Sequence, residues 1–146
     1  MSDPLEIETA AIRLLAAREH SRKELLGKLR TRGFDRERID AVLDDLAQRG
    51  LQSDARFTEQ YIVGRVHKGS GPLRICAELH ERGIDAGEIE RALEPYAEQW
   101  RERLRRVHDQ KYGAAPPKDR KEMARRARFL EYRGFPSELI AEFIFP

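Results

Sequence analysis

The stretch "LRTRGFDRERIDAVL", residues 29–43, recurs twice more in this chain with small changes. Residues 79–93 read "LHERGIDAGEIERAL", and residues 130–144 read "LEYRGFPSELIAEFI". Each copy has arginine, glycine and an apolar residue at the same offset. Self-similarity at a nearly constant spacing is typical of repeat proteins, in which one supersecondary unit recurs along the chain.

Each copy has the pattern of one helix ending and a second helix beginning. In the first copy, Ser21 and Glu24 match a capping box, and a stripe of leucines at helical spacing follows them. Gly33 suits the position after a helix, where positive φ is required. Asp35 is then expected to cap the next helix. The first copy therefore predicts a helical hairpin.

The other two copies carry the same signals in other residues. Pro72 suits a first helical position and Gly83 a helix end, while Asp85 with Glu88 forms a second capping box pattern. In the third copy Gly134 ends the first helix of the pair. A further helical pattern precedes each pair, at residues 10–18, 55–66 and 100–112.

The sequence therefore predicts an all-α fold of three tandem three-helix repeats. No segment alternates with period two, so no sheet is expected. Because each repeat of such a protein contacts only its neighbours, we expect an elongated, curved array. The expected organisation is an N-terminal tail and three repeats, at residues 1–8, 9–52, 53–98 and 99–146.

Composition limits the class of protein. The 146 residues contain one cysteine and no apolar run long enough for a membrane span, and the N-terminus lacks the pattern of a signal peptide. We therefore expect a cytoplasmic monomer with no membrane contact. The net charge is +2, but residues 100–146 hold twelve Lys and Arg against seven Asp and Glu. Such asymmetry suits a polyanionic partner, although a solvated helix surface explains it equally well.

No pattern for catalysis is present. There is no nucleophile elbow, no phosphate-binding glycine loop after a strand and no HExxH motif. Asp44 and Asp45 are adjacent and so diverge on a helix, and Cys76 occupies an apolar stripe, where we expect it in the core. The histidines are scattered, without a cysteine cluster that would suggest zinc. We expect neither an enzyme nor a cofactor or metal.

The strongest candidate for a binding surface is the basic segment near the C-terminus. On a helix, Lys121, Arg125, Arg128 and Tyr132 fall on one face, and few acidic residues interrupt them. A cationic stripe that ends in an aromatic residue suits a phosphate backbone with stackable bases. Further candidates for contact with DNA or a protein partner are Tyr61, Arg65, Lys68, Arg74, Arg103 and Arg106.

The arginines before the repeated glycines have two possible roles. Arg32, Arg82 and Arg133 could bind phosphate, but a cation in the last turn of a helix also stabilises the negative end of the helix dipole by about 0.3–1 kcal/mol. We favour the structural role for these residues and for the glycines that follow them.

Two segments resemble the RecX family, whose members regulate the bacterial recombinase RecA. The first is "DARFTEQYIVGRVHKGSGPLRICAELHERGI", residues 54–84, and the second is "RFLEYRGF", residues 128–135. The resemblance extends from about residue 9 to residue 146 and includes all three repeats. Two features depart from the family pattern: the long segment "GAAPPKD", and Arg126 at the position that Leu25 occupies in the first repeat.

The resemblance implies a non-enzymatic regulator of RecA. Such a protein is expected to bind the filament of RecA on single-stranded DNA, with weaker binding to bare DNA, and to suppress ATP turnover and strand exchange. Its expected setting is recombinational repair and the SOS response.

Two other classes remain possible from the residues alone. One is an autonomous DNA-binding protein built from helix–turn–helix units, although the helix that begins near Glu88 is more acidic than a recognition helix should be. The other is a helical scaffold that binds only protein.

Overall fold

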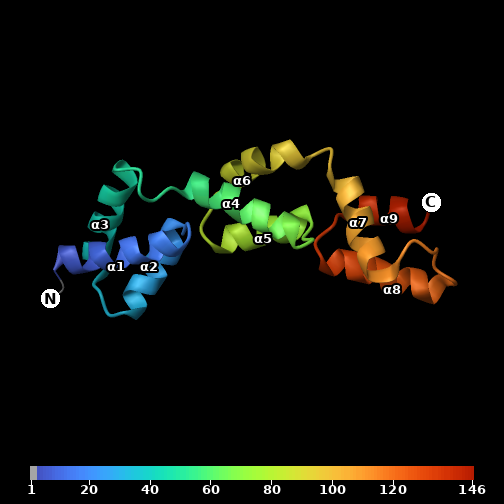
Figure 1. Cartoon of the computed structure of the whole chain (residues 1–146), viewed down its shortest axis with the longest axis horizontal. Coiled ribbons are helices and arrows are strands. Elements are labelled where there is room, and N and C mark those ends of the chain that lie inside the picture. Colours follow the sequence, from blue (N-terminus) through green and yellow to red (C-terminus); the bar gives the residue numbers. More distant parts are fainter. Residues whose placement is uncertain (1–2) are drawn as a thin grey trace. The chain divides into compact units, whose positions relative to one another are not determined.

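A computed structural model describes residues 3–146. These residues form nine α-helices and one short 3-10 helix, with no strand among them, so the predicted all-α class is confirmed (Figure 1). The elements are α1 (Pro4–Ala17), α2 (Arg22–Thr31), α3 (Arg36–Gln48), α4 (Asp54–His67), α5 (Pro72–Glu81), α6 (Ala86–Leu93), η1 (Glu94–Tyr96), α7 (Trp100–Tyr112), α8 (Arg120–Tyr132) and α9 (Ser137–Ile144).

Successive groups of three helices are called modules here: α1–α3 are module 1, α4–α6 module 2 and α7–α9 module 3. The chain divides into two compact units. The first contains the described residues up to Tyr61 together with Leu79–Ile89, and the second contains Ile62–Glu78 together with Glu90–Pro146. Module 2 therefore contributes to both units. The predicted curvature of the array stays a prediction.

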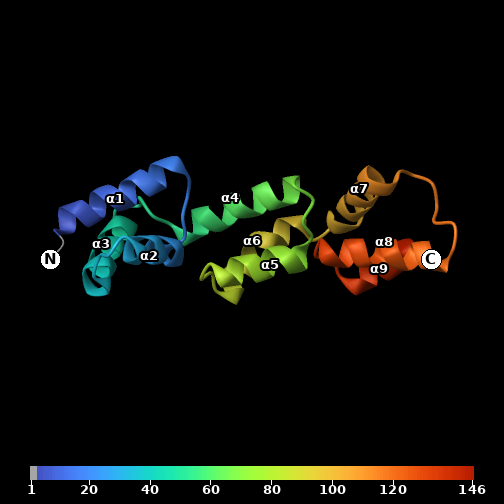
Figure 2. The same ribbon diagram turned by 90° about the horizontal axis from the view of Figure 1, so that it is seen from below.

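Module 1 is a mutually packed set of helices, in which α1, α2 and α3 each contact the other two (Figures 1 and 2). Their apolar stripes meet in one core. Its fully or almost fully buried members are Ile7, Ala10, Ala11, Leu25, Leu29, Ile39, Val42, Leu43 and Leu46.

Helix α1 begins earlier than the sequence patterns indicate. The segment 1–8 is expected to be a tail, but residues from Pro4 onward are helical, and the Asp3 side chain accepts a hydrogen bond from the Leu5 N–H at 3.0 Å. Ile7 is fully buried, and Glu8 pairs with Arg49 at 2.6 Å. The apolar stripe that starts at Ile7 therefore extends the helix toward the N-terminus. Met1 and Ser2 lie outside the described residues.

The expected caps form in two of three cases. Ser21 Oγ accepts from the Glu24 N–H at 3.1 Å, and Glu24 Oε1 accepts from the Ser21 N–H at 3.1 Å, which completes the capping box. Asp85 Oδ1 accepts from the Glu88 N–H at 3.0 Å. Asp35 occupies the N-cap position of α3, but its side chain makes no capping hydrogen bond.

Module 3 is packed in the same way, since α7, α8 and α9 each contact the other two (Figure 2). Aromatic residues contribute much of its interior. Trp100 meets Phe135 edge to face at 6.5 Å between ring centroids, and His108 meets Phe143 at 4.8 Å. Leu104, Leu130, Ile140 and Ile144 are the buried aliphatic residues of these helices.

The two departures from the family pattern, Arg126 and the long segment before α8, contact each other in module 3. Arg126, only 4% exposed, replaces a core leucine, and its guanidinium donates to Ala115 O at 2.9 Å within the long segment before α8. It also pairs with Glu122 at 2.5 Å and contacts His108 Nε2 at 3.2 Å. The long loop thus supplies a hydrogen-bond acceptor for the buried guanidinium. Burial of this charge without a partner would cost free energy.

Cys76 differs from the expectation of a core position. The residue is only half-buried on α5, and this partial burial raises the pKa of its thiol.

The repeated glycines end their helices as predicted. Gly33, Gly83 and Gly134 have φ values of 92°, 85° and 99°, in the left-handed region that favours glycine. Each follows the last turn of the second helix of its module.

At two of these turns, the glycine also allows a close approach to the preceding module. A Cβ atom at Gly83 would lie 2.8 Å from Lys23 Cβ, in the first turn of α2. Arg82 Nε lies 3.7 Å from Glu24 Oε2, and its guanidinium lies 4.9 Å from the Tyr61 ring centroid. All of these residues belong to the first compact unit.

The equivalent contact in the second compact unit is closer. A Cβ at Gly134 would overlap Arg74, and one at Gly71 would lie 2.5 Å from the Gly134 backbone. The Gly71 N–H donates to Arg133 O at 2.7 Å, and Arg133 Nη1 donates to Lys68 O at 2.8 Å. Arg82 and Arg133 therefore have tertiary partners in addition to the helix dipole.

Candidate nucleic-acid interface

The outer face of α8 carries cations without acidic partners. Asp119 caps this helix through the Glu122 N–H at 2.9 Å, and the spacing of Lys121, Arg125 and Arg128 places these three on one exposed side. None of the three has a carboxylate partner within residues 3–146. The face therefore keeps its full positive charge.

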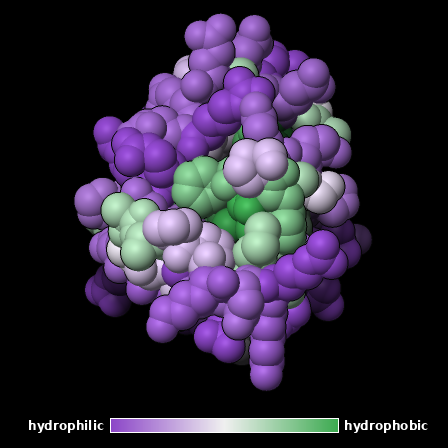
Figure 3. All heavy atoms as spheres, turned by 90° about the vertical axis from the view of Figure 1, so that its right-hand side faces the viewer, coloured by the Kyte–Doolittle hydropathy of each residue, from purple (hydrophilic) through white to green (hydrophobic). Residues whose placement is uncertain are grey.

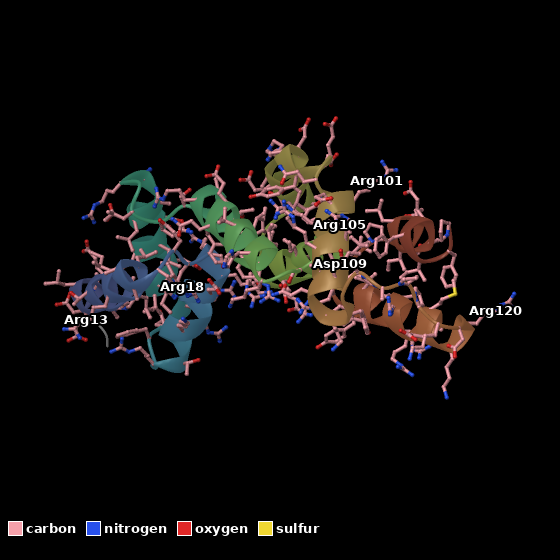
Figure 4. All side chains as sticks on the ribbon, turned by 45° about the vertical axis from the view of Figure 1, so that its right-hand side comes forward. Arg13, Arg18, Arg101, Arg105, Asp109 and Arg120 are labelled. Carbon is pink, nitrogen blue, oxygen red and sulfur yellow. The ribbon has the colours of Figure 1, made fainter. Side chains whose placement is uncertain are left out.

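The neighbouring helix α7 is different, because its arginines are paired. Arg105 contacts Glu102 at 2.5 Å and Asp109 at 3.4 Å, and Arg106 lies 3.5 Å from Glu102. Arg101 pairs with Glu142 of α9 at 3.1 Å. Figure 4 shows Arg101, Arg105 and Asp109 along α7, with Arg120 at the start of α8. Exposed pairs of this kind add little stability, but they reduce the local charge.

Three further candidates lie near the C-terminal end of α8. Tyr132 is 72% exposed, and the Arg74 guanidinium lies 5.1 Å from its ring centroid. Arg74 Nε also lies 3.4 Å from Glu78 Oε2, so part of its charge is already balanced. The carbonyl of Lys68 is held by Arg133, the residue after Tyr132, which brings the loop before α5 to the same place. The structure thus brings Arg74, Tyr132 and the backbone of Lys68 to the C-terminal end of α8.

The two candidates on α4 are held within the fold and do not adjoin α8. Arg65 is half-buried and pairs with Glu78 at 2.9 Å. Tyr61 packs against Phe57 and under Arg82. Both side chains therefore stabilise the fold and are not free for a ligand.

On α7, Arg103 bonds Gln99 Oε1 at 3.0 and 2.8 Å and lies over the Tyr96 ring. Arg106 shares Glu102 with Arg105. Among the contacts of the described residues, none connects these two arginines with the face of α8. We therefore leave them out of the interface.

One residue of the interface does not stand out in the sequence patterns. Arg120 is exposed at the first position of α8, and it too lacks a carboxylate partner within residues 3–146. It does not fall in the helical stripe of Lys121, but its place at the tip of the helix adds to the same positive region (Figure 4). The density of basic residues in "KDRKEMARRAR" is the signal that could have included it.

Glu122 is the acidic residue closest in sequence to this face, but it does not neutralise it. The hydrogen bond from Arg126 lowers the pKa of Glu122, so the carboxylate is ionised and committed to the buried guanidinium. The exposed cations on the other side of α8 keep their charge.

An apolar area also reaches the surface of module 3. Figure 3 shows it with polar side chains around it. Phe145, just after α9, is 51% exposed. An apolar centre within a polar rim is typical of a surface that binds protein.

Within residues 3–146, no three His, Cys, Asp or Glu side chains gather in a way that could hold a metal ion. None of the helices described there is long and apolar enough to cross a membrane.

Three tandem three-helix modules define an all-α repeat protein. Family models identify it further, because residues 9–46, 53–93 and 97–144 match the first, second and third three-helix domains of RecX, in that order. The chain belongs to the RecX family.

Similar proteins of other bacteria are named regulatory protein RecX. The regulatory protein RecX of Pseudomonas savastanoi pv. phaseolicola is 42% identical over 144 residues, which cover 99% of this chain and 93% of the relative. That of Ectopseudomonas mendocina is 43% identical over 99% of this chain and 96% of its own length. For Halorhodospira halophila the identity is 42% over 92% of this chain and 83% of the relative.

Solved structures have the same fold. The crystal structure of RecX from Lactobacillus salivarius superposes with a TM-score of 0.80 over 97% of this chain and 94% of that chain, at 23% identity. A second crystal structure, of a regulatory protein RecX, gives a TM-score of 0.81 at 20% identity, over 97% of this chain and 70% of that chain.

Proposed function

We propose that this protein binds the filament of RecA on single-stranded DNA and inhibits or modulates the recombinase, ATPase and coprotease activities of RecA. It acts as a cytoplasmic monomer in recombinational DNA repair and the SOS response. Membership in a family whose members are named regulatory proteins supports this proposal, and so does the absence of any catalytic motif in the sequence.

The observation that carries the proposal is the unpaired charge of α8. Many exposed arginines of the described chain have a carboxylate within reach, whereas Lys121, Arg125 and Arg128 have none. Phosphates of single-stranded DNA would supply the missing negative charge and release counterions on binding. Tyr132 and Arg74 at the end of the same face suit an unpaired base, which stacks on aromatic rings and guanidinium planes.

The partner is the filament and not bare DNA, because the interface offers few contacts for DNA alone. The four cations of α8, with Lys68, Arg74 and one aromatic residue near its end, give modest binding to a single strand at physiological salt. The apolar area on module 3 suits an additional protein surface (Figure 3). A molecule held to both DNA and RecA would hinder ATP turnover and strand exchange along the filament.

The proposal is tested by the DNA-dependent ATPase of RecA on poly(dT). We expect the purified protein to lower the rate at amounts equal to or below those of RecA, and to bind bare single-stranded DNA at least tenfold more weakly than the filament. An unchanged ATPase rate would contradict the proposal.

The same preparation separates the two alternatives. A sequence-specific footprint on duplex DNA, without an effect on RecA, would identify an autonomous DNA-binding protein. Equal binding to RecA with and without DNA would identify a scaffold that recognises protein alone.

A further inference from the structure

Two of the three repeated Arg-Gly pairs contact the preceding module in a similar way. In each, the glycine packs on the first turn of the second helix of the preceding module, and the arginine meets an oxygen near the start of that helix. For Arg82 this oxygen belongs to the Glu24 carboxylate, at 3.7 Å, and for Arg133 it is the carbonyl of Lys68, at 2.8 Å.

The first Arg-Gly pair, Arg32 and Gly33 in module 1, has no such contact, and we call it the open pair. Gly33 has the same left-handed backbone, with φ 92°, but nothing lies within 4 Å of the place where a Cβ would stand. The Arg32 side chain is exposed, and its one contact within residues 3–146 is with the Phe34 ring, at 5.9 Å from the centroid. Phe34 is only half-buried, whereas its counterparts Ile84 and Phe135 are 2% and 1% exposed.

A cleft of about 400 Å³ adjoins this open pair, within the first compact unit. Phe34 and Leu5 give it an apolar part, and Arg32 and Arg13 give it a cationic part. Leu5 is exposed although it is large and apolar. The acidic residues that also line it, Asp3 and Glu6, lie at the start of α1, and neither pairs with Arg32 in the described part of the chain. Arg13 is labelled on α1 in Figure 4.

We propose that the Arg32–Gly33 turn and this cleft form a docking surface for another protein, and that the element docked is the first turn of a helix carrying a carboxylate. The carboxylate meets Arg32 as Glu24 meets Arg82, and the backbone of the helix start meets Gly33 as Arg74 meets Gly134. This inference rests on the proposed function, since it assigns the helix to a RecA subunit of the filament. It adds that module 1 contacts RecA protein and not DNA.

A second copy of this chain does not supply the required helix. The equivalent helix starts on α2 and α5 are already occupied within the chain. On α8, one additional turn precedes the buried Leu130, since this helix begins at Arg120. Arg125 also stands at the position of Glu24, so it would repel Arg32. Module 3 therefore does not offer the kind of helix start that would dock on module 1 of another copy.

The test substitutes Gly33→Asn and measures binding to RecA filaments on poly(dT). Asparagine tolerates the left-handed conformation better than other residues with a Cβ, and the space at Gly33 is open in the free chain. A partner helix would leave no room for the new side chain. We expect binding to weaken at least tenfold.

Gly50→Asn is the matched control, because Gly50 has φ 73° and equally open space, and it lies in the same module after α3. We expect its affinity to stay within twofold of the unaltered protein. Equal affinities of the Gly33 and Gly50 variants, whether both unchanged or both reduced, would overturn the inference.

Charge gives a second measurement. Arg32→Glu is expected to weaken filament binding at least tenfold. Arg30→Glu, an equal charge change at an exposed residue in the last turn of α2, is expected to weaken it less than threefold. A photoreactive side chain at Thr31 should cross-link to RecA. Cross-links to DNA or to a second copy of this chain would contradict the assignment.

Failure of the proposed function is visible before any variant is made, since the unaltered protein would then not bind the filament. Failure of this inference alone leaves filament binding intact and sensitive to changes on α8.

Discussion

At the scale of single residues, His20 shows how burial makes stability depend on pH. The side chain is 1% exposed; its Nδ1 lies 3.0 Å from Arg18 O and its Nε2 lies 2.9 Å from Lys28 Nζ. These contacts fit a neutral ring with the proton on Nδ1, because Nε2 accepts from an ammonium group. Burial lowers the pKa of His20 below its ordinary value.

This lowered pKa predicts that stability falls as the solution becomes acidic. The unfolded chain binds a proton near pH 6.5, whereas the folded chain resists it, so the contribution of His20 is complete above about pH 6.5 and is lost as pH falls toward the folded pKa. We expect the free energy of unfolding in urea to decrease between pH 7.5 and pH 5.5. His20→Gln should remove part of this decrease.

His67→Gln, the same substitution at an exposed histidine, is the matched control. A His20→Gln profile parallel to that of the unaltered protein would show that His20 is not the group that titrates.

Two glycines with opposite surroundings give a second prediction at this scale. Gly71→Ala places a Cβ 2.5 Å from the Gly134 backbone, and we expect it to destabilise the protein by about 1–3 kcal/mol through overpacking. Gly64 lies within α4 with nothing within 4 Å, so Gly64→Ala should stabilise by about 0.5–1 kcal/mol. Thermal unfolding of the two variants checks both signs, and a stabilising Gly71→Ala would disprove the close approach.

At the scale of helices, the repeated apolar positions determine which face is buried. Leu79 is fully buried on α5, while Leu73 on the same helix is 56% exposed. We expect Leu79→Ala to cost about 2–5 kcal/mol through lost burial and a cavity, and Leu73→Ala to change stability by less than about 0.5 kcal/mol. Denaturant unfolding measures both. Equal stability of the two variants would contradict the assigned face.

Helices were the most predictable part of the protein. The capping box at Ser21 and the glycine at each helix end act within a few residues, so the sequence alone reveals them. The start of α1 was less visible, because its stripe begins with Ile7 among acidic residues. Local patterns thus located the helices but not every boundary.

The candidate interface was predictable only in part. The stripe of Lys121, Arg125 and Arg128 follows from helical spacing, and all three residues are exposed. Arg65 resembled them in sequence, but Glu78, 13 residues away, neutralises it. Tertiary contacts decide which cations are paired, and helical periodicity does not predict tertiary contacts.

At the scale of the whole molecule, the three modules have the same plan but different surfaces. Module 1 has an open Arg-Gly turn, and module 3 has a cationic helix with an additional first turn. Two Arg-Gly contacts between successive modules are repeated within the chain, whereas nothing lies within 4 Å of a Cβ at Gly33 in the open turn.

The unpaired cations of α8 are expected to hold the filament. We expect Lys121→Ala/Arg125→Ala/Arg128→Ala to bind RecA filaments on poly(dT) at least tenfold more weakly, with thermal stability nearly unchanged. Binding of this variant should also depend less on salt. The slope of log affinity against log salt should be smaller in magnitude by about 2, because three phosphate contacts are lost.

The decisive measurement compares this variant with Arg36→Ala/Arg49→Ala/Arg105→Ala, which removes the same charge from arginines already paired with carboxylates. Filament affinity is measured for both at physiological salt. We predict a large loss for the α8 variant and less than a threefold change for the control. Equal affinities of the two variants would contradict the role of the α8 cations.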